Sequence, residues 1–178
     1  MIKDGRIEGG RWIASPNREP GLRPRLLVLH YTGGSLASAL DWLTNEASDV
    51  SAHFVISRHG EVTQLVRTDE IAWHCGVSTW VIDGKETRGL NRYAIGIELA
   101  NFGRVSAIYP ARHECVLIDG VWWHNFPPVQ ISATVALALE LVREYSLELV
   151  RHSDISPGRK VDPGPAFPWG TFVKAITA

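Results

Sequence analysis

The chain has 178 residues, of which 45% are hydrophobic and 21% are charged, a composition that fits one globular domain and argues against a disordered or fibrous protein. Its formal net charge of −1 excludes the broad excess of Lys and Arg typical of proteins that bind nucleic acid or anionic membranes. Charged residues between positions 3 and 8 interrupt any apolar signal segment, and no run is apolar enough to span a membrane. We therefore expect a cytoplasmic monomer that binds no nucleic acid and does not insert into a membrane.

The first half of the chain is predicted to begin with an arm and to continue into strands and a helix. Residues 1–24 are rich in Gly, Pro and Arg and are expected to be extended, so the domain proper is expected to comprise 25–178. The apolar run at 25–29 predicts a buried strand. The elements expected next are a helix over 36–46, capped by Ser35, and a hairpin formed by strands at 51–57 and 62–66.

The second half is predicted to alternate loops with regular elements. Residues 75–92 are polar and are expected to form a surface loop, and residues 102–128 are expected to be irregular. Between them, 93–99 shows the alternating apolar pattern of a strand. Apolar residues at spacings of three and four predict an amphipathic helix over 129–145. A short strand at 148–151 and a closing helical turn at 171–176 complete a single α/β domain.

The chain contains seven His, seven Trp and two Cys. The two cysteines, Cys75 and Cys115, are too few for a disulfide framework and form no Cys-x-x-Cys motif, so both are expected to be free thiols. A surplus of His and Trp occurs in metal and sugar sites, but it also occurs without any function. The positions of these residues in the sequence therefore decide whether they form a functional site.

Three residues have the chemistry of a metal site. His30 and His152 each follow an apolar strand, where loops build sites on a rigid scaffold, and Asp162 follows later in the same C-terminal segment. Three protein ligands with one open position is the arrangement of a catalytic zinc site, and neutral imidazole and carboxylate are suitable ligands. This set leaves Zn²⁺ with a single net positive charge, which can acidify a bound water. The spacing alone has little specificity, because a chain with several His supplies such a set by chance.

Two further residues are candidates for acid-base chemistry. Glu98 lies within an apolar strand, where an unpaired carboxylate is costly, so it is expected to be paired, protonated or close to a metal ion. A raised pKa would suit a general base, and the alternative is a salt bridge at a strand edge. Lys160 is two positions from Asp162, and in an extended segment both side chains would face the same side. Its ammonium group could stabilise an oxyanion, and the alternative is an exposed loop lysine.

Five stretches of the sequence together resemble the zinc N-acetylmuramoyl-L-alanine amidases of the type-two family, which includes phage lysins and is related to the peptidoglycan recognition proteins. The stretches are LVLHYT at 27–32, SAHFVI at 51–56, AWHCG at 72–76, NRYAIGIE at 91–98 and RHSDISPGRKVDPG at 151–164. Their order and spacing hold over most of the chain, and the last stretch is highly specific.

This resemblance implies a mixed β-sheet flanked by helices, with a zinc groove on one side. It implies that His30, His152 and Asp162 hold Zn²⁺. It also implies that Glu98 acts as the base on a metal-bound water and that Lys160 stabilises the oxyanion. These are the residues that the chemistry of the sequence singles out independently.

The resemblance also suggests how the groove contacts its substrate. Trp73 and His74 are expected to line it, Asn101 could hydrogen-bond the stem peptide, and His53 could lie behind the ligands, although each could equally serve packing. Some family members carry a catalytic Tyr where this chain has Ala52, which leaves Glu98 as the expected base.

The expected reaction is zinc-dependent hydrolysis of the amide bond between the lactyl group of N-acetylmuramic acid and L-alanine, in peptidoglycan or in a soluble muropeptide. A bacterial recycling enzyme and a phage-type lysin both fit, and residues 102–128, with Trp122-Trp123, could set substrate preference. The main alternative is a non-catalytic peptidoglycan-recognition module, which would lack a ligand or the base. A zinc carboxypeptidase would show another ligand pattern. A cysteine peptidase using Cys75 with His74 is disfavoured, because adjacent residues on a strand point to opposite faces.

Overall fold

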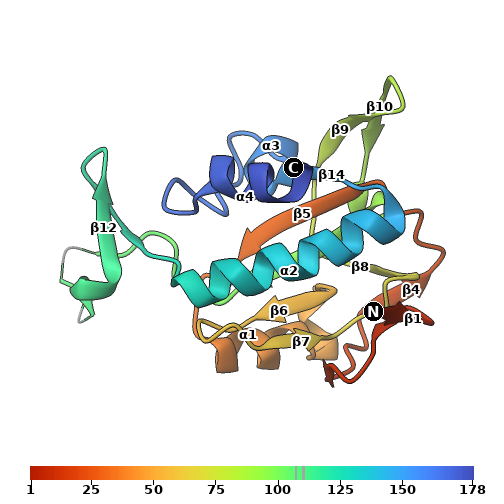
Figure 1. Cartoon of the computed structure of the whole chain (residues 1–178), viewed down its shortest axis with the longest axis horizontal. Coiled ribbons are helices and arrows are strands. Elements are labelled where there is room, and N and C mark those ends of the chain that lie inside the picture. Colours follow the sequence, from red (N-terminus) through yellow and green to blue (C-terminus); the bar gives the residue numbers. More distant parts are fainter. Residues whose placement is uncertain (107, 110) are drawn as a thin grey trace.

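A six-stranded mixed β-sheet forms the centre of the molecule (Figure 1). The computed structural model describes every residue except 107 and 110, and it does not describe the side chain of residue 112. In spatial order the sheet contains β14 (Glu148–Arg151), β5 (Leu26–Tyr31), β11 (Ala94–Leu99), β6 (Phe54–Ile56), β7 (Val62–Gln64) and β3 (Arg11–Trp12). The first four of these run parallel, and β7 returns antiparallel to β6. The predicted α/β class and the predicted hairpin are confirmed.

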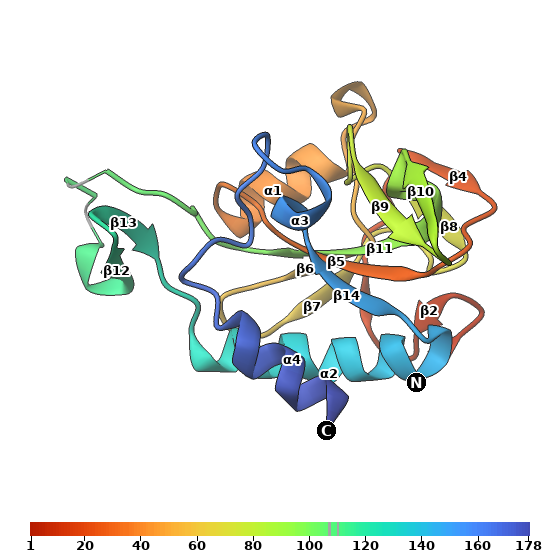
Figure 2. The ribbon, with the colours of Figure 1, turned by 90° about the horizontal axis from the view of Figure 1, so that it is seen from above.

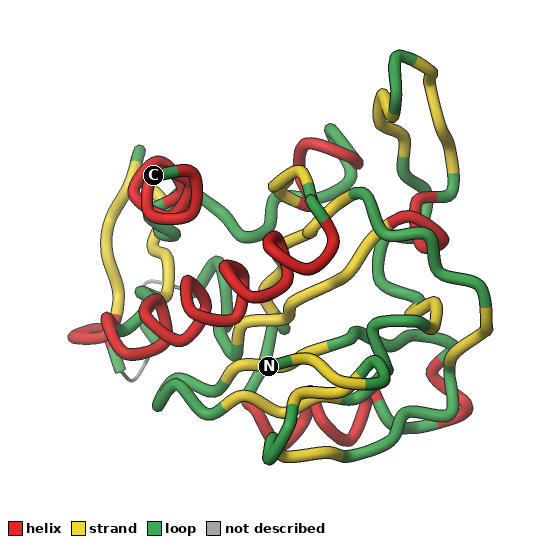
Figure 3. The backbone as a smooth tube through the Cα atoms, turned by 45° about the vertical axis from the view of Figure 1, so that its right-hand side comes forward, coloured by secondary structure: helices red, strands yellow, loops and turns green. Residues whose placement is uncertain are grey.

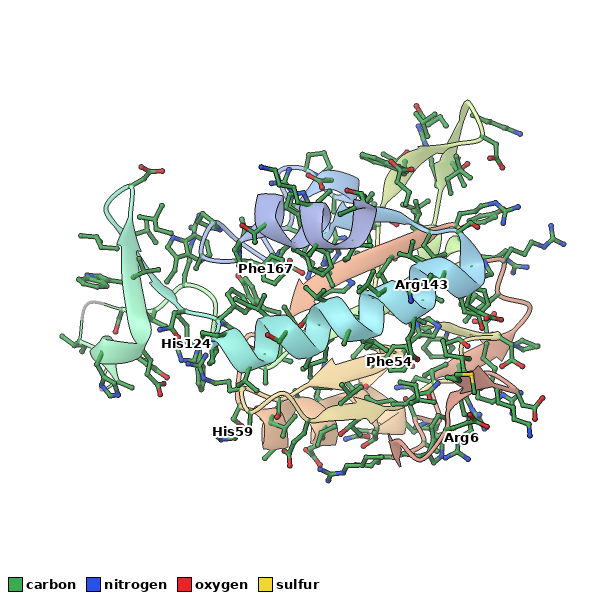
Figure 4. All side chains as sticks on the ribbon, in the orientation of Figure 1. Arg6, Phe54, His59, His124, Arg143 and Phe167 are labelled. Carbon is green, nitrogen blue, oxygen red and sulfur yellow. The ribbon has the colours of Figure 1, made fainter. Side chains whose placement is uncertain are left out.

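Helices cover both faces of this sheet (Figure 2). On one face lie α2 (Pro128–Tyr145) and α4 (Trp169–Thr177), and on the other lie α1 (Leu36–Leu43) and α3 (His152–Ile155). The main core fills the space beneath α2 and α4, where Phe54, Phe167 and Phe172 are buried (Figure 4). Two separate buried clusters occupy the α1 face.

Alternation along the two central strands decides which side chains reach the α1 face. Leu27 and Leu29 of β5 and Ile95 and Ile97 of β11 pack into the core beneath α2, as their alternating pattern predicts. The even-numbered residues of both strands point the other way. His30 and Glu98 therefore share the α1 face, and the parallel register places them side by side on neighbouring strands.

Local sequence signals mark both ends of α2 and the start of α1, but α1 ends at Leu43, three residues before its predicted end. α2 starts at a proline, whose missing N–H is harmless in the first turn, and stops at Ser146, which has a left-handed backbone with φ of 54°. α1 is capped by Ser35, whose Oγ accepts a hydrogen bond from the N–H of Ser38 at 3.2 Å. The closing helical turn is longer than expected, because α4 begins at Trp169.

Three two-stranded hairpins stand at the edges of the fold. They are β1 (Ile2–Lys3) with β2 (Arg6–Ile7), β9 (Thr79–Ile82) with β10 (Lys85–Arg88), and β12 (Cys115–Ile118) with β13 (Val121–His124). Each turns through an Asp-Gly pair with positive φ at both residues, namely Asp4-Gly5, Asp83-Gly84 and Asp119-Gly120. Asp-Gly favours this type I′ turn, whose twist matches that of the flanking strands.

Two of these hairpins correct the sequence analysis. The surface loop expected at 75–92 contains β9 and β10, and the irregular segment expected at 102–128 contains β12 and β13. Both hairpins project from the body of the molecule (Figures 1 and 3). Strands β9, β10 and β12 are largely exposed, whereas β13 buries Trp123 and His124 at its end. No alternation of apolar and polar residues marks either hairpin in the sequence.

The first 24 residues are extended over much of their length, but they are not a detached arm. β3 joins the edge of the main sheet beside β7, and β4 (Arg18–Pro20) pairs with β8 (Glu70–Ala72). The side-chain amide of Asn17 donates to the carbonyl oxygens of Asn45 and Val50 at 2.9 and 2.8 Å. Short 3₁₀ helices at Glu46–Ser48, Leu90–Tyr93 and Arg112–Glu114 complete the fold. Within the described chain no helix is long and apolar enough to cross a membrane.

Candidate metal centre and cleft

A cleft of about 780 Å³ opens on the α1 face of the sheet. Its lining includes residues of α1 and of the segment 159–162. Seven residues that the sequence analysis singles out also line it, namely His30, Trp73, His74, Glu98, His152, Lys160 and Asp162. The fold thus brings together side chains as much as 132 positions apart in the sequence.

His30, His152 and Asp162 form a compact triad in this cleft. β5 and β14 are adjacent and parallel, so the residues at their carboxyl ends meet, and His30 and His152 lie there. Their Nδ1 atoms are 2.8 Å apart. Oδ2 of Asp162 lies 2.8 Å from Nδ1 of His152 and 3.1 Å from Nδ1 of His30. All three side chains are buried.

Hydrogen bonds on the outer ring nitrogens assign the tautomers of both imidazoles. Nε2 of His152 lies 3.2 Å from the carbonyl oxygen of Cys75, so Nε2 carries the proton and Nδ1 carries an electron pair. Nε2 of His74 donates to the carbonyl oxygen of Ala94 at 3.2 Å, so Nδ1 of His74 is an acceptor. That atom is 2.9 Å from Nε2 of His30, which must be the donor. Nδ1 of His30 is then also unprotonated.

Three electron-pair donors therefore converge with no hydrogen assigned between them. Their separations approach the roughly 3.3 Å edge of a coordination tetrahedron with zinc–ligand bonds of about 2.0 Å. Two lone pairs facing a carboxylate at this range repel each other unless a cation lies between them. The triad thus fits a divalent metal ion with two imidazole ligands and one carboxylate ligand.

The ionisation states of the triad also suit metal binding. Desolvation lowers the pKa of His30 to about 4, which keeps its ring neutral at physiological pH. A neutral His and an ionised carboxylate are the forms that bind a metal.

Glu98 faces the same cleft from β11. This strand lies between β5 and β6, so the alternative of a salt bridge at a sheet edge does not apply. Oε2 of Glu98 is shielded from solvent and has no hydrogen-bond partner in the described part of the chain. Burial raises the pKa of Glu98 to about 8, the charge of Asp162 adds to the rise, and Lys160 counters it. A carboxyl group that titrates near neutral pH without a committed partner has the properties of a general base.

Comparison with known proteins places this arrangement in a family. Residues 20–165 match the model of the family described as N-acetylmuramoyl-L-alanine amidase. The chain belongs to this family. The resemblance found in the sequence is thereby confirmed, and so is the fold that it implies.

Two relatives from Escherichia coli (strain K12) differ in how much of their length this family member spans. It is 35% identical over 158 residues to the N-acetylmuramoyl-L-alanine amidase AmiD. This alignment covers 83% of this chain and 51% of AmiD. It is 31% identical over 193 aligned residues to the 1,6-anhydro-N-acetylmuramyl-L-alanine amidase AmpD. This alignment covers 97% of this chain and 94% of AmpD. The chain thus spans about half the length of AmiD and most of the length of AmpD.

Solved structures of E. coli AmiD and of an AmpD protein share the fold of this family member. AmiD from E. coli in complex with the substrate anhydro-N-acetylmuramic acid-L-Ala-D-gamma-Glu-L-Lys has a TM-score of 0.71 at 34% identity, covering 86% of this chain and 57% of that one. A selenomethionine derivative of AmpD has a TM-score of 0.74 at 26% identity, covering 99% of both chains.

The cleft of this family member includes lining residues that the sequence analysis misses. Trp42 is 57% exposed and lines the cleft together with Asp41 and Arg159. An indole face exposed in a cleft offers a stacking surface for a sugar ring or a peptide. The sequence could have indicated that Trp42 is exposed. Leu36, Leu40 and Leu43 form the core-facing side of α1, and Trp42 does not belong to that side.

Two of the expected substrate contacts lie outside the cleft lining. His53 is buried beneath it, where Nε2 donates to the carbonyl oxygen of Glu70 at 2.9 Å and Nδ1 accepts from the N–H of Gly96 at 3.1 Å. Asn101 is also buried, and its amide donates to the carbonyl oxygens of His124 and Asn125 at 3.2 and 2.8 Å. Both side chains thus hold the protein together in this structure, and neither presents a free polar group to the cleft.

None of the histidines and tryptophans in the described part of residues 102–128 lines the cleft. His124 is buried at the base of β13 (Figure 4), and its Nε2 donates to Glu114 at 3.2 Å. Trp123 is buried beneath the guanidinium of Arg104. His113 is exposed, as is His59 in the β6–β7 turn.

Cys75 corrects one argument of the sequence analysis. Cys75 and His74 do not point apart, because Sγ of Cys75 lies 3.4 Å from Nδ1 of His74. Cys75 is nevertheless fully buried, and burial raises the pKa of its thiol, so a thiolate nucleophile is not available. Neither Cys75 nor Cys115 forms a disulfide bond, as expected.

The metal-free protein is expected to lose stability as the pH rises from 6.5 to 8. The pKa of Glu98 is about 8 in the folded protein against an ordinary value of 4.5, so the folded state binds more protons in this interval and rising pH favours unfolding. His30 and His53, whose pKa values are lowered to about 4 from 6.5, oppose this trend only below pH 6.5. The free energy of unfolding in urea should fall by up to about 1.4 kcal/mol per pH unit. The decline should disappear in Glu98→Gln, and its persistence would assign the titration to another group.

Proposed function

We propose that this protein is a zinc-dependent amidase that hydrolyses the bond between the lactyl group of N-acetylmuramic acid and L-alanine in peptidoglycan or a soluble muropeptide. The observation that carries the proposal is the meeting, in one cleft, of three converging ligand atoms and a carboxylate oxygen without a partner. The names of AmiD and AmpD describe this chemistry, and the AmiD complex contains a muropeptide substrate.

The proposed metal ligands are His30, His152 and Asp162. Zinc, when bound by two neutral imidazoles and one carboxylate, supplies a net positive charge that polarises a carbonyl group and acidifies water. The bonds from His152 to the carbonyl of Cys75 and from His30 to His74 would hold each Nδ1 in place for a bound ion. The buried surroundings keep competing water away from the two rings.

The proposed proton carrier is Glu98. Its carboxylate takes a proton from the water that attacks the lactyl carbonyl, and it then gives this proton to the nitrogen of the departing L-alanine, so the carboxylate is restored. A pKa raised toward neutrality suits both steps. Lys160 lines the same cleft, and its ammonium offsets the negative charge that develops on the carbonyl oxygen. Trp73 and Trp42 offer apolar surfaces for the sugar and the stem peptide.

Product analysis is expected to show one specific cut. The protein should be incubated with purified cell-wall peptidoglycan and, separately, with a soluble anhydro-muropeptide, and the products analysed by mass spectrometry. We expect intact stem peptides that begin with L-alanine. Their release should stop with a chelator and return when Zn²⁺ is added. The ratio of the two rates shows which form of substrate is preferred.

Two other outcomes would contradict the proposal. Stem peptides shortened at the far end would indicate a carboxypeptidase. Tight muropeptide binding with no product, in the presence of Zn²⁺, would indicate a recognition module of the same fold.

A further inference from the structure

We propose that His74 is a positioning residue of the metal centre and not a substrate contact. It acts by accepting a hydrogen bond from Nε2 of His30, which fixes the tautomer and orientation of that ligand. This inference rests on the proposed metal ligands, but it does not depend on which bond the protein cleaves.

Both ring nitrogens of His74 are already engaged within the protein. Nε2 donates to the carbonyl oxygen of Ala94 at 3.2 Å, and Nδ1 lies 2.9 Å from Nε2 of His30. A neutral imidazole ring has one donor and one acceptor. Both are used, so His74 has no polar group left for a substrate although its ring lines the cleft.

The geometry of the two rings fits a directed hydrogen bond. The planes of His30 and His74 are inclined by 85°, with centroids 5.0 Å apart. The backbone carbonyl of Ala94 belongs to β11, one of the central strands of the sheet. A rigid backbone acceptor therefore fixes His74, and His74 fixes His30, in the manner by which outer partners orient metal-binding imidazoles.

Gly96 supplies the space that His74 needs. A Cβ atom added to Gly96 would lie 2.6 to 2.7 Å from atoms of the His74 ring, which is closer than real Cβ contacts. Gly96 does not have a positive φ, so the close approach of the ring accounts for the glycine and backbone conformation does not. Three alternate positions of β11 thus serve the centre, because Ala94 accepts, Gly96 makes room and Glu98 faces the cleft.

The test compares His74 with the neighbouring His53. His53 is also neutral and bonded to backbone on both nitrogens, and its ring centroid is 5.7 Å from that of His74, but it does not contact a triad residue. The variants are His74→Phe, which removes the acceptor, His74→Asn, which restores an acceptor near the Nδ1 position, and His53→Phe as the matched control. The measurement is the dissociation constant for Zn²⁺, by competition with a chromophoric chelator, with the Co²⁺ absorption spectrum and the Tm of each metal-free protein.

We expect His74→Phe to weaken Zn²⁺ binding by about 10- to 100-fold and to alter the Co²⁺ spectrum. His74→Asn should recover much of this loss. His53→Phe should lower the Tm but leave the Zn²⁺ dissociation constant within about threefold of the wild type, since it loses only bonds to backbone. Failure of the protein to cleave any muropeptide would not alter these expectations.

The proposal would be overturned if His74→Phe bound Zn²⁺ as tightly as the wild type. It would also be overturned if His53→Phe lost the same affinity, because the effect would then reflect general loosening. Should His74→Phe fail to fold, nitrogen NMR of the Zn²⁺-loaded wild type decides the matter. The expected state has His74 protonated at Nε2, and a His74 protonated at Nδ1 would refute the hydrogen bond from His30.

Discussion

Replacing Glu98 with Gln is expected to slow amide hydrolysis by about 10²- to 10⁴-fold while Zn²⁺ remains bound. The two side chains have nearly the same shape, but a carboxamide cannot take up and return a proton. Glu98 is not part of the triad, so the dissociation constant for Zn²⁺ should change little. Steady-state rates with a soluble muropeptide and the metal content of the purified variant measure the two effects separately.

Glu61→Gln is the matched control for this change. Glu61 is exposed in the turn between β6 and β7 and is absent from the cleft lining, so its variant should hydrolyse at the wild-type rate. A wild-type rate in Glu98→Gln would remove Glu98 from the reaction. Loss of bound Zn²⁺ from that variant would instead show that the carboxylate supports the metal.

Asp162→Asn is expected to abolish detectable hydrolysis and to weaken Zn²⁺ binding by more than the roughly 100-fold typical for the loss of a residue that only touches a ligand. The change removes the one anionic ligand of the triad, whose oxygen lies within 3.1 Å of both imidazoles. The metal-free variant should melt at least as high as the metal-free wild type. The reason is that a carboxamide N–H can donate to the two unprotonated Nδ1 atoms, which the carboxylate only repels.

Asp41→Asn separates this effect from a general loss of negative charge. Asp41 lines the same cleft from α1 but is not part of the triad. Its variant should bind Zn²⁺ as the wild type does. If Asp162→Asn retained Zn²⁺, or if its metal-free form were strongly destabilised, Asp162 would have a structural role and would not be a ligand.

The central elements of the fold could be predicted because their signals are local. The apolar run before His30, the alternation along 93–99 and the helical spacing over 129–145 each lie within one short window. The hairpins at Thr79–Arg88 and Cys115–His124 could not be found in this way, because neither shows an alternation of apolar and polar residues along its strands. Their Asp-Gly turns, Asp83-Gly84 and Asp119-Gly120, are the local signal of a hairpin that the sequence does contain.

The candidate site could be predicted as a set of residues but not as an arrangement. The position of His30 and His152 after apolar strands indicates a functional edge, yet their meeting depends on the pairing of β5 with β14, which is far from local. The same holds for His74, because its bond to Ala94 requires strand β11 to lie beneath it. Asn101 is a further case, because its amide donates to the carbonyl oxygens of His124 and Asn125, and no local pattern indicates these bonds.

The alternation along β11 restricts how this strand can change in evolution. Substitutions at its core-facing positions can be accommodated by repacking, but insertion or deletion of a single residue before Glu98 would exchange the two sides of everything that follows. Glu98 would then point beneath α2, where Ile97 and Leu99 now pack, and an apolar side chain would face the cleft. The core-facing positions of the strand can therefore vary in sequence, whereas its length between Ala94 and Glu98 is fixed. Family members that retain this cleft should show gaps only outside that interval.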